Sequence, residues 1–372
     1  MTNIHNLLNH ILNDNSGYVH YTFSNTDGKT WLMPQNDMKT AMNLYQPSGI
    51  KGKLMKRFFP YFHRIKPLRT KLGIAQNRYE LQNSLKDLLS QIFHSDNFQF
   101  SVFCGTPSNH QKITVQISKG SNILGYCKIS DRENIKQLFS REEKILNTLK
   151  AKNINQIPEC LYCGSLTDNI DLFVQSTVKT NHSKVLHKWN SQHWAFLANL
   201  KQQTEQILPF EQTDYFRDID KLRQNQSYLS IPDRNMIDSA IDKVMDYYGG
   251  KLVTFCAYHA DFTPWNMFLE QNQLFVFDFE YAQLTYPPYL DWFHFFTQCC
   301  IFEERLNANE IYNAYLIQKR KETEYLKNSD FYYLCYLLNI LSLYLEREKG
   351  LYNNHDVKKS LSIWLKLIYF LI

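Results

Sequence analysis

The spacing of hydrophobic and polar residues changes along the chain and predicts different elements in different regions. Residues 1–15 and 77–94 have the spacing of helices. Residues 17–34 alternate around an Asp-Gly turn, which predicts a β-hairpin. Residues 97–130 predict three strands, 140–152 a helix and 169–179 another strand, whereas residues 184–250 and those after Pro288 are mostly helical in pattern.

This order predicts an α+β fold, because the strands are largely segregated from the helices instead of alternating with them. We expect three regions: an N-terminal extension of residues 1–95, a strand-rich region of residues 96–180, and a mainly helical region of residues 181–372, which carries a small hairpin. A hydrophobic content of 44% is enough for a sizeable core and argues against general disorder.

The charge is unevenly distributed along the chain, because residues 39–79 contain ten Lys or Arg and no acidic residue. Apolar residues recur there at helical spacing, and we expect Pro60 to kink or interrupt the helix. Residues 51–72 could lie on an anionic membrane surface. They could equally pack on the protein core and offer a basic face to an anionic substrate, or form only a solvated face. The acidic balance of the remaining chain argues against nucleic acid.

The eight cysteines are scattered, and several lie in apolar runs, which is typical of reduced thiols in the cytoplasm. Cys160 and Cys163 form a C-x-x-C pair, but a zinc site would need a second pair of ligands at suitable spacing. We therefore expect two cysteines on a strand. The sequence has no recognisable secretory signal and no run of about 20 apolar residues that could span a membrane.

The candidate chemistry begins with AYHADFTPWNMF, residues 257–268, which places His259, Asp261 and Asn266 on a loop between two apolar strands. Taken alone, the loop could be a structural turn, since Asp and Asn favour turns. A second strand nearby ends in Asp278 and Glu280, and residues two apart on an extended chain face the same side. Such a cluster of oxygen atoms suits Mg²⁺.

Lys128 lies in the apolar strand GYCKIS, where an unpaired ammonium group would be costly. The following helix offers Glu142 or Glu143 as a partner. A paired lysine, an aspartate able to accept a proton, an asparagine and a metal-binding aspartate are the working parts of phosphoryl transfer.

HADFTPWN followed by VFDFEYA resembles the catalytic signatures of the aminoglycoside phosphotransferase and choline kinase families, over roughly residues 95–345. The resemblance implies a protein-kinase-like fold with a strand-rich N-terminal lobe and a helical C-terminal lobe. It also implies ATP and Mg²⁺ as cofactors and a set of residue roles. Asp261 would take the proton of the acceptor. Lys128 would contact the α/β-phosphates and would pair with Glu142. The metal would be held by Asn266, Asp278 and Glu280, and the loop would be supported by His259 and Asp291.

The nucleotide-binding part resembles the family less closely. The segment CGTPSNHQK has one glycine, and its Thr106, Ser108 and Asn109 would help backbone N–H groups to cradle phosphate. The strand that includes Gln175 leads to a linker around Thr177, which would meet the adenine. The family's usual glycine between His and Asp is Ala260 here, a mild change unless the position needs a positive φ.

The acceptor follows less directly from the sequence. The N-terminal extension resembles kinases associated with bacterial surface-polysaccharide assembly, which favours a sugar or a glycan on a lipid carrier. An amino-alcohol kinase of the choline or ethanolamine type is the alternative. A nucleotide-binding pseudokinase scaffold without turnover is the alternative from another class.

Overall fold

The computed structural model describes residues 4–47, 49–321, 328–349 and 355–372. By their contacts these residues form two compact units. The first comprises residues 1–151, 155–185 and 268–280, and the second comprises residues 152–154, 186–267 and 281–372. The sequence division at residues 95 and 180 stays a prediction.

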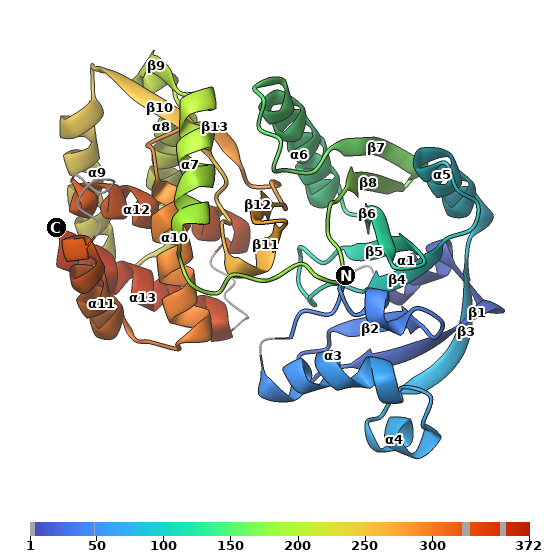
Figure 1. Ribbon diagram of the computed structural model, residues 1–372. Helices are drawn as coiled ribbons and strands as arrows, with labels where there is room; N and C mark the ends of the chain where they lie inside the picture. Colours follow the sequence, from blue (N-terminus) through green and yellow to red (C-terminus); the bar gives the residue numbers. More distant parts are fainter. Residues whose placement is uncertain (1–3, 48, 322–327, 350–354) are drawn as a thin grey trace. The chain divides into compact units, whose positions relative to one another are not determined.

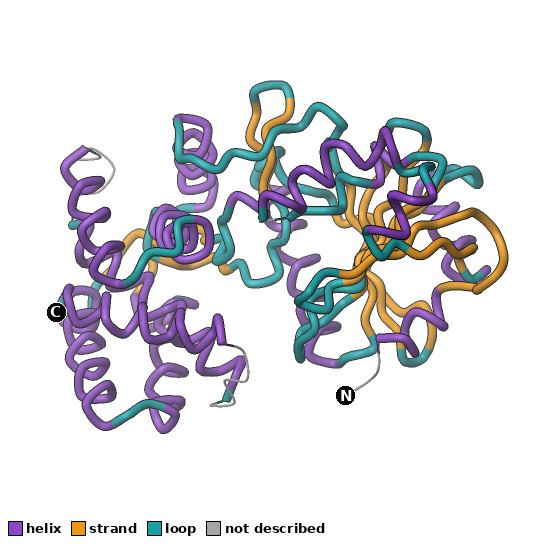
Figure 2. The backbone as a smooth tube through the Cα atoms, turned by 90° about the horizontal axis from the view of Figure 1, so that it is seen from below, coloured by secondary structure: helices purple, strands orange, loops and turns teal. Residues whose placement is uncertain are grey.

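An antiparallel sheet of eight strands forms the centre of the first unit (Figures 1 and 2), in the order β3-β1-β2-β4-β5-β6-β8-β7. The hairpin expected at residues 17–34 is present, with Ser24 opposite Thr30. The N-terminal strands therefore continue the same sheet as β4 to β8. The bounds are β1 Leu12–Ser24, β2 Thr30–Pro34, β3 Ala75–Leu81, β4 Gln99–Phe103, β5 Ile113–Lys119, β6 Asn122–Ser130, β7 Cys160–Thr167 and β8 Ile170–Ser176.

Both faces of this sheet are covered, which explains its apolar strands. Helices α1 and α5 pack on one face through residues such as Leu7 and Leu85, against Val102 and Ile129. The short helix α2 and Phe59 of α3 pack on the other face near β1 and β2. The bounds are α1 Ile4–Ile11, α2 Met38–Ala41, α3 Ile50–Phe62, α4 Lys66–Lys71, α5 Asn83–Phe93 and α6 Glu133–Ala151.

The hairpin of β11 (Met267–Glu270) and β12 (Gln273–Val276) belongs to the first unit from residue 268 onwards, although residues 186–267 of the second unit precede it in sequence. Lys184 and Leu269 exchange two backbone hydrogen bonds, of 3.0 and 2.7 Å. The N–H of Val276 donates to the carbonyl of Gln156 at 3.0 Å. These bonds fix the segment that leads directly to Asp278.

The second unit is mainly helical and contains a small sheet of order β13-β10-β9. Helix α12 is buried almost all round, as is typical of a central helix. Buried tyrosines surround it; the hydroxyl of Tyr215, for example, donates to the carbonyl of Cys335 at 3.1 Å. The bounds are α7 Ser191–Thr204, β9 Gln206–Pro209, α8 Asp214–Asn225, α9 Ile231–Tyr248, β10 Leu252–Tyr258, β13 Gln283–Tyr286, α10 Leu290–Gln298, α11 Ala308–Lys321, α12 Ser329–Glu348 and α13 His355–Leu371.

Three sequence expectations need correction. The segment expected as one helix at 77–94 is β3 followed by α5, and the helix expected at 1–15 ends at Ile11, where β1 follows. Pro60 lies inside α3, and the helical run breaks not at Pro60 but after Phe62, before α4 begins at Lys66. Among the described helices, none combines the length and apolar character that crossing a bilayer requires.

Candidate active site

Lys128 is the centre of an ion-paired cluster within the first unit. It lies on β6 opposite Phe173 of β8, on the sheet face away from the core residues Cys127 and Ile129. Its Nζ donates to Glu142 Oε2 and to Asp278 Oδ1, both at 2.6 Å. The ammonium group is thus nearly removed from water but is held between two carboxylates.

Electrostatics keeps Lys128 protonated. Burial alone would lower the pKa of its ammonium group, but attraction by Asp278, Glu142 and Glu280 outweighs burial and raises that pKa. Burial is also the largest effect on Glu142 and raises the pKa of its carboxyl to about 7, while Lys128 acts in the opposite direction. Glu142 is fully buried on α6, and its Oε1 accepts the N–H of Phe279 at 3.1 Å.

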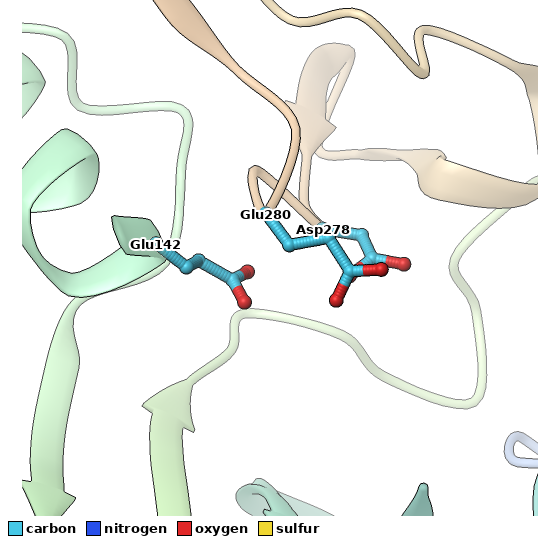
Figure 3. A group of neighbouring side chains, drawn as sticks. All are labelled: Glu142, Asp278 and Glu280. Carbon is cyan, nitrogen blue, oxygen red and sulfur yellow. The ribbon is translucent and has the colours of Figure 1, made fainter. Parts of the chain in front are cut away.

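Asp278 and Glu280 come together in a turn. Strand β12 ends at Val276, and Asp278 has a φ of +71°, so the expectation that an extended strand aligns the two carboxylates is wrong. Carboxylate oxygens of Asp278, Glu280 and Glu142 nevertheless all lie within 4.8 Å of one another (Figure 3). An all-oxygen set of this kind fits a hard divalent cation such as Mg²⁺.

Lys112 is a member of the cluster that the sequence reasoning missed. It stands just before β5, pairs with Glu280, and lies 4.0 Å from Asp278. With Lys128 it gives the cluster two cations beside three carboxylates. Its position at the end of the phosphate-loop candidate is the only sequence signal that could have indicated it.

The phosphate-loop candidate is a tight connection between β4 and β5. A Cβ on Gly105 would lie 2.3 Å from the carbonyl oxygen of Lys112, and its φ is +73°, so only glycine fits there. Arg132 donates to the carbonyl of Ser108 at 2.6 Å, and the side chain of Ser108 accepts the N–H of His110. Thr106 and Asn109 are exposed on the same loop.

The adenine-site candidates lie at and after the end of β8. Gln175 is buried, and its Oε1 has no hydrogen-bond partner among the described residues. A buried acceptor of this kind is an unusual feature, and a bound ligand can satisfy it. Thr177 Oγ1 instead accepts the N–H of Lys179 at 3.1 Å and shapes the linker.

The loop of residues 259–266 belongs to the second unit and follows β10. The N–H groups of His259 and Ala260 donate to the carboxylate of Asp291 at 3.0 and 3.2 Å. His259 Nδ1 in turn accepts the N–H of Asp261 at 3.1 Å. Both side chains therefore hold the loop backbone, which is the contact expected of their supporting roles.

Ala260 has a φ of +68°, so this position does need the left-handed conformation that glycine adopts easily. An alanine there costs roughly 1–2 kcal/mol of conformational strain. The two hydrogen bonds to Asp291 hold the strained backbone in place. Burial raises the pKa of Asp291 to about 7, against the lowering effect of these two hydrogen bonds.

Asp261 is the one acidic residue among positions 259–266, and 36% of its side chain is exposed. Asn266 Nδ2 donates to its Oδ2 at 2.7 Å and to its backbone carbonyl at 3.0 Å. His294 Nε2 lies 3.3 Å from its Oδ1 and was not predicted. His294 sits on α10, 33 residues further along, and its sequence neighbourhood of aromatic residues gives no sign of this contact.

Comparison with known proteins assigns the fold of this chain to a known class. No protein-family model and no curated protein sequence matches the chain. Among solved structures, a thermostable mutant of aminoglycoside phosphotransferase APH(4)-Ia matches in its apo form with a TM-score of 0.50 and 12% identity, covering 77% of this chain and 98% of that one. The same values hold for a ternary complex of that enzyme with ADP and hygromycin B. The chain thus has the α+β kinase-like fold of aminoglycoside phosphotransferases, with a strand-rich N-terminal lobe and a helical C-terminal lobe, and the resemblance seen in its motifs is confirmed at the level of fold.

Proposed function

We propose that the protein is an ATP-dependent phosphotransferase that phosphorylates a hydroxyl group of a small polar acceptor. The observation that carries the proposal is Lys128, held at 2.6 Å from both Glu142 and Asp278 inside a kinase-like fold. A buried lysine fixed by two acids is oriented to contact phosphate oxygens once a nucleotide binds. The similar structure of aminoglycoside phosphotransferase APH(4)-Ia in ternary complex with ADP and hygromycin B supports this proposal.

In the proposed reaction, the acceptor oxygen forms a bond to the γ-phosphorus of ATP. The bond from that phosphorus to the bridging oxygen breaks, and ADP leaves with the electron pair. The acceptor proton passes to the carboxylate of Asp261, whose exposure makes it reachable and whose orientation is set by Asn266 and His294. The products are a phosphate monoester and ADP.

Several groups would bind the nucleotide in this proposal. Lys128 and Lys112 would contact phosphate oxygens, and Thr106, Ser108 and Asn109 would support the phosphate loop. Gln175 and the backbone around Thr177 would meet the adenine.

Asp278 and Glu280 would hold Mg²⁺, and Asn266 is the further ligand predicted from the resemblance. The ion would neutralise phosphate charge when bound. Asn266 uses its Nδ2 in both of its hydrogen bonds to Asp261, which leaves its amide oxygen to act as the ligand atom.

For the acceptor, we propose a sugar or a surface-glycan intermediate, on the basis of the N-terminal extension. A place in polysaccharide biosynthesis and a location in the cytoplasm belong to the same proposal. The eight cysteines are free thiols, as a reducing compartment allows. A peripheral contact of residues 51–72 with the inner face of the membrane would bring the enzyme to an acceptor on a lipid carrier.

The test is ADP release by the purified protein with ATP, Mg²⁺ and a panel of sugars, amino alcohols and aminoglycosides. Mass spectrometry of the acceptor should show the gain of one phosphoryl group. Turnover only with choline or ethanolamine would assign the amino-alcohol alternative. ATP binding without turnover on any acceptor would favour the pseudokinase scaffold.

The variant Asp261→Asn should abolish turnover and keep ATP binding, because Asn cannot accept the proton but can retain the contacts to Asn266 and His294. Asp214→Asn is a matched control, since Asp214 lies in the same unit and its carboxylate accepts backbone N–H groups of β13, not of the loop. Equal turnover of Asp261→Asn and the unchanged protein would contradict the assignment of the base.

A further inference from the structure

Helices α3 and α4 expose an unusual number of large apolar side chains. Ile50 and Tyr61 are 78% and 72% exposed, and five others are 46–51% exposed. Scattered exposed apolar residues are normal, but a group within 23 consecutive residues marks an interaction surface. We name this group the apolar face of α3 and α4; its members are Ile50, Leu54, Phe58, Tyr61, Phe62, Ile65 and Leu72.

The opposite side of α3 holds it to the sheet. Phe59 is buried, with its ring 6.1 Å from that of Tyr21, and His63 is also buried against Tyr21. Arg69 of α4 lies over the ring of Tyr21 at 4.9 Å. The helices are therefore already anchored without the apolar face, and folding does not account for its seven residues. The segment thus packs on the protein core through Phe59 and His63, and the seven residues of the apolar face lie outside that contact.

Cations surround the apolar face without any acidic residue. The whole segment of residues 39–79 lacks Asp and Glu. Six of its cations on or beside α3 and α4 are exposed, namely Lys51, Lys53, Arg57, Arg64, Lys66 and Lys71. Most of the residues of the apolar face on α3 recur at intervals of three or four positions, so they share one side of the helix, and the cations lie among and beside them. The surface is therefore suited to a partner that is anionic and can also bury apolar side chains.

We propose that the apolar face of α3 and α4, with its six cations, binds the surface of an anionic lipid bilayer. A bilayer presents a negatively charged headgroup layer directly above an apolar interior, which matches both properties at once. Nucleic acid offers the charge without an apolar layer to receive Ile50 and Leu54. Tyr61 suits the headgroup boundary, where rings with one polar end are favoured. Phe58 and Phe62 suit the apolar side of an interfacial helix, which enters the bilayer below the headgroups. The inference does not depend on phosphotransfer.

The experiment is co-sedimentation of the full chain, without nucleotide, with vesicles of phosphatidylcholine alone or with 30% phosphatidylglycerol. Binding to the anionic vesicles should exceed binding to the neutral ones at least tenfold and should weaken as NaCl rises from 50 to 500 mM. Equal binding to both vesicle types, or no binding to either, would overturn the proposal.

Two variants separate the apolar and charged contributions. Replacing Leu54, Phe58 and Tyr61 with Ser should weaken vesicle binding at least tenfold. The matched control replaces Ile207, Ile231 and Leu252 with Ser, since these residues are 68–70% exposed in the second unit. Changing Lys51, Lys53 and Arg57 to Gln should reduce binding roughly a hundredfold, at about fivefold per cation.

A control with a soluble polyanion completes the design. If heparin binds as tightly as the anionic vesicles, and if the apolar variant binds vesicles as well as the unchanged protein, the surface recognises charge alone and the bilayer proposal is refuted. Circular dichroism and thermal unfolding of each variant show whether it is folded. Because no ATP is present, failure of vesicle binding leaves the proposed phosphotransferase activity untouched.

Discussion

Lys179 should make the stability of the protein rise with pH around neutrality. Its side chain is only 9% exposed, and no carboxylate of the described residues lies within 4.0 Å of its Nζ. Its Nζ donates a 3.4 Å hydrogen bond to the carbonyl of Asn43 and lies 5.6 Å from the centre of the Phe268 ring. Burial, with a smaller repulsion from Lys56, lowers the pKa of Lys179 to about 7.

The sign and size of this pH effect on stability follow from the difference in proton binding between the folded and unfolded states. In the unfolded chain Lys179 titrates near its ordinary pKa of 10.5, so at pH 8 the unfolded state holds the proton that the folded state has released. Stability therefore rises as pH increases through 7 and is lost as pH falls through it. For a folded pKa of about 7, the change between pH 6 and pH 8 amounts to about 1.4 kcal/mol in the free energy of unfolding.

The assay is urea unfolding at pH 6, 7 and 8, followed by circular dichroism, for the unchanged protein and for Lys179→Met. The variant should be more stable than the unchanged protein at pH 6, and this advantage should shrink by about 1.4 kcal/mol at pH 8. Asp291, whose pKa burial raises to about 7, has the opposite sign: it contributes stability at low pH that is lost as pH rises towards 7. Asp291 is present in both proteins, so the difference between their free energies of unfolding reports the effect of Lys179 alone.

Lys184→Met is the matched control, because Lys184 lies on the same linker with an exposed side chain. It should show the same pH dependence as the unchanged protein. The reasoning is refuted if Lys179→Met and the unchanged protein lose or gain stability in parallel from pH 6 to pH 8.

Three further predictions concern the site. Ala260→Gly should raise the free energy of unfolding, measured with urea, by up to about 1 kcal/mol. The relief of left-handed backbone strain exceeds the added conformational freedom of the unfolded chain. The control Ala257→Gly, on β10, should lower the free energy of unfolding. Glu142→Gln should weaken ATP binding in calorimetry. It should also cost about 1–3 kcal/mol of stability, because the buried Lys128 loses one of its two charged hydrogen-bond partners. An equal loss in Glu143→Gln would contradict the choice of Glu142. His294→Phe should lower kcat roughly tenfold with KM for ATP unchanged, and a change in KM alone would argue against a role at Asp261.

Local sequence patterns predicted the α+β class and most strands of the first unit, because alternation and turn residues are local properties. They failed at residues 75–81. The sequence AQNRYEL is compatible with a helix, but pairing with β1, about 60 residues earlier, makes it a strand. Strand preference depends on such neighbours, which a window of the sequence does not contain.

The same limit applies to the candidate site. The contact between Lys128 and Glu142 could be predicted, since a lysine in an apolar strand needs an acid and the next helix supplies one. Lys112 had only its place at the end of the phosphate-loop candidate as a signal, and His294 had none, because each meets its acid through a separation of 33 residues or more. The positive φ of Ala260 was equally hidden, since alanine itself gives no signal of a left-handed backbone.

The placement of the β11–β12 hairpin in the first unit has a consequence for how the chain folds during synthesis. Strand β8 ends at Ser176, and β12 begins only at Gln273, after residues 186–267 of the second unit have been made. At roughly 5–20 residues per second, the ribosome needs on the order of 5–20 s to cover that interval. During this time the eight-stranded sheet can form, but Lys128 and Glu142 have not yet met Asp278. Until Asp278 is made, the buried ammonium group of Lys128 has only Glu142 of its two carboxylate partners, so the nascent first unit passes through a state in which this cluster is incomplete.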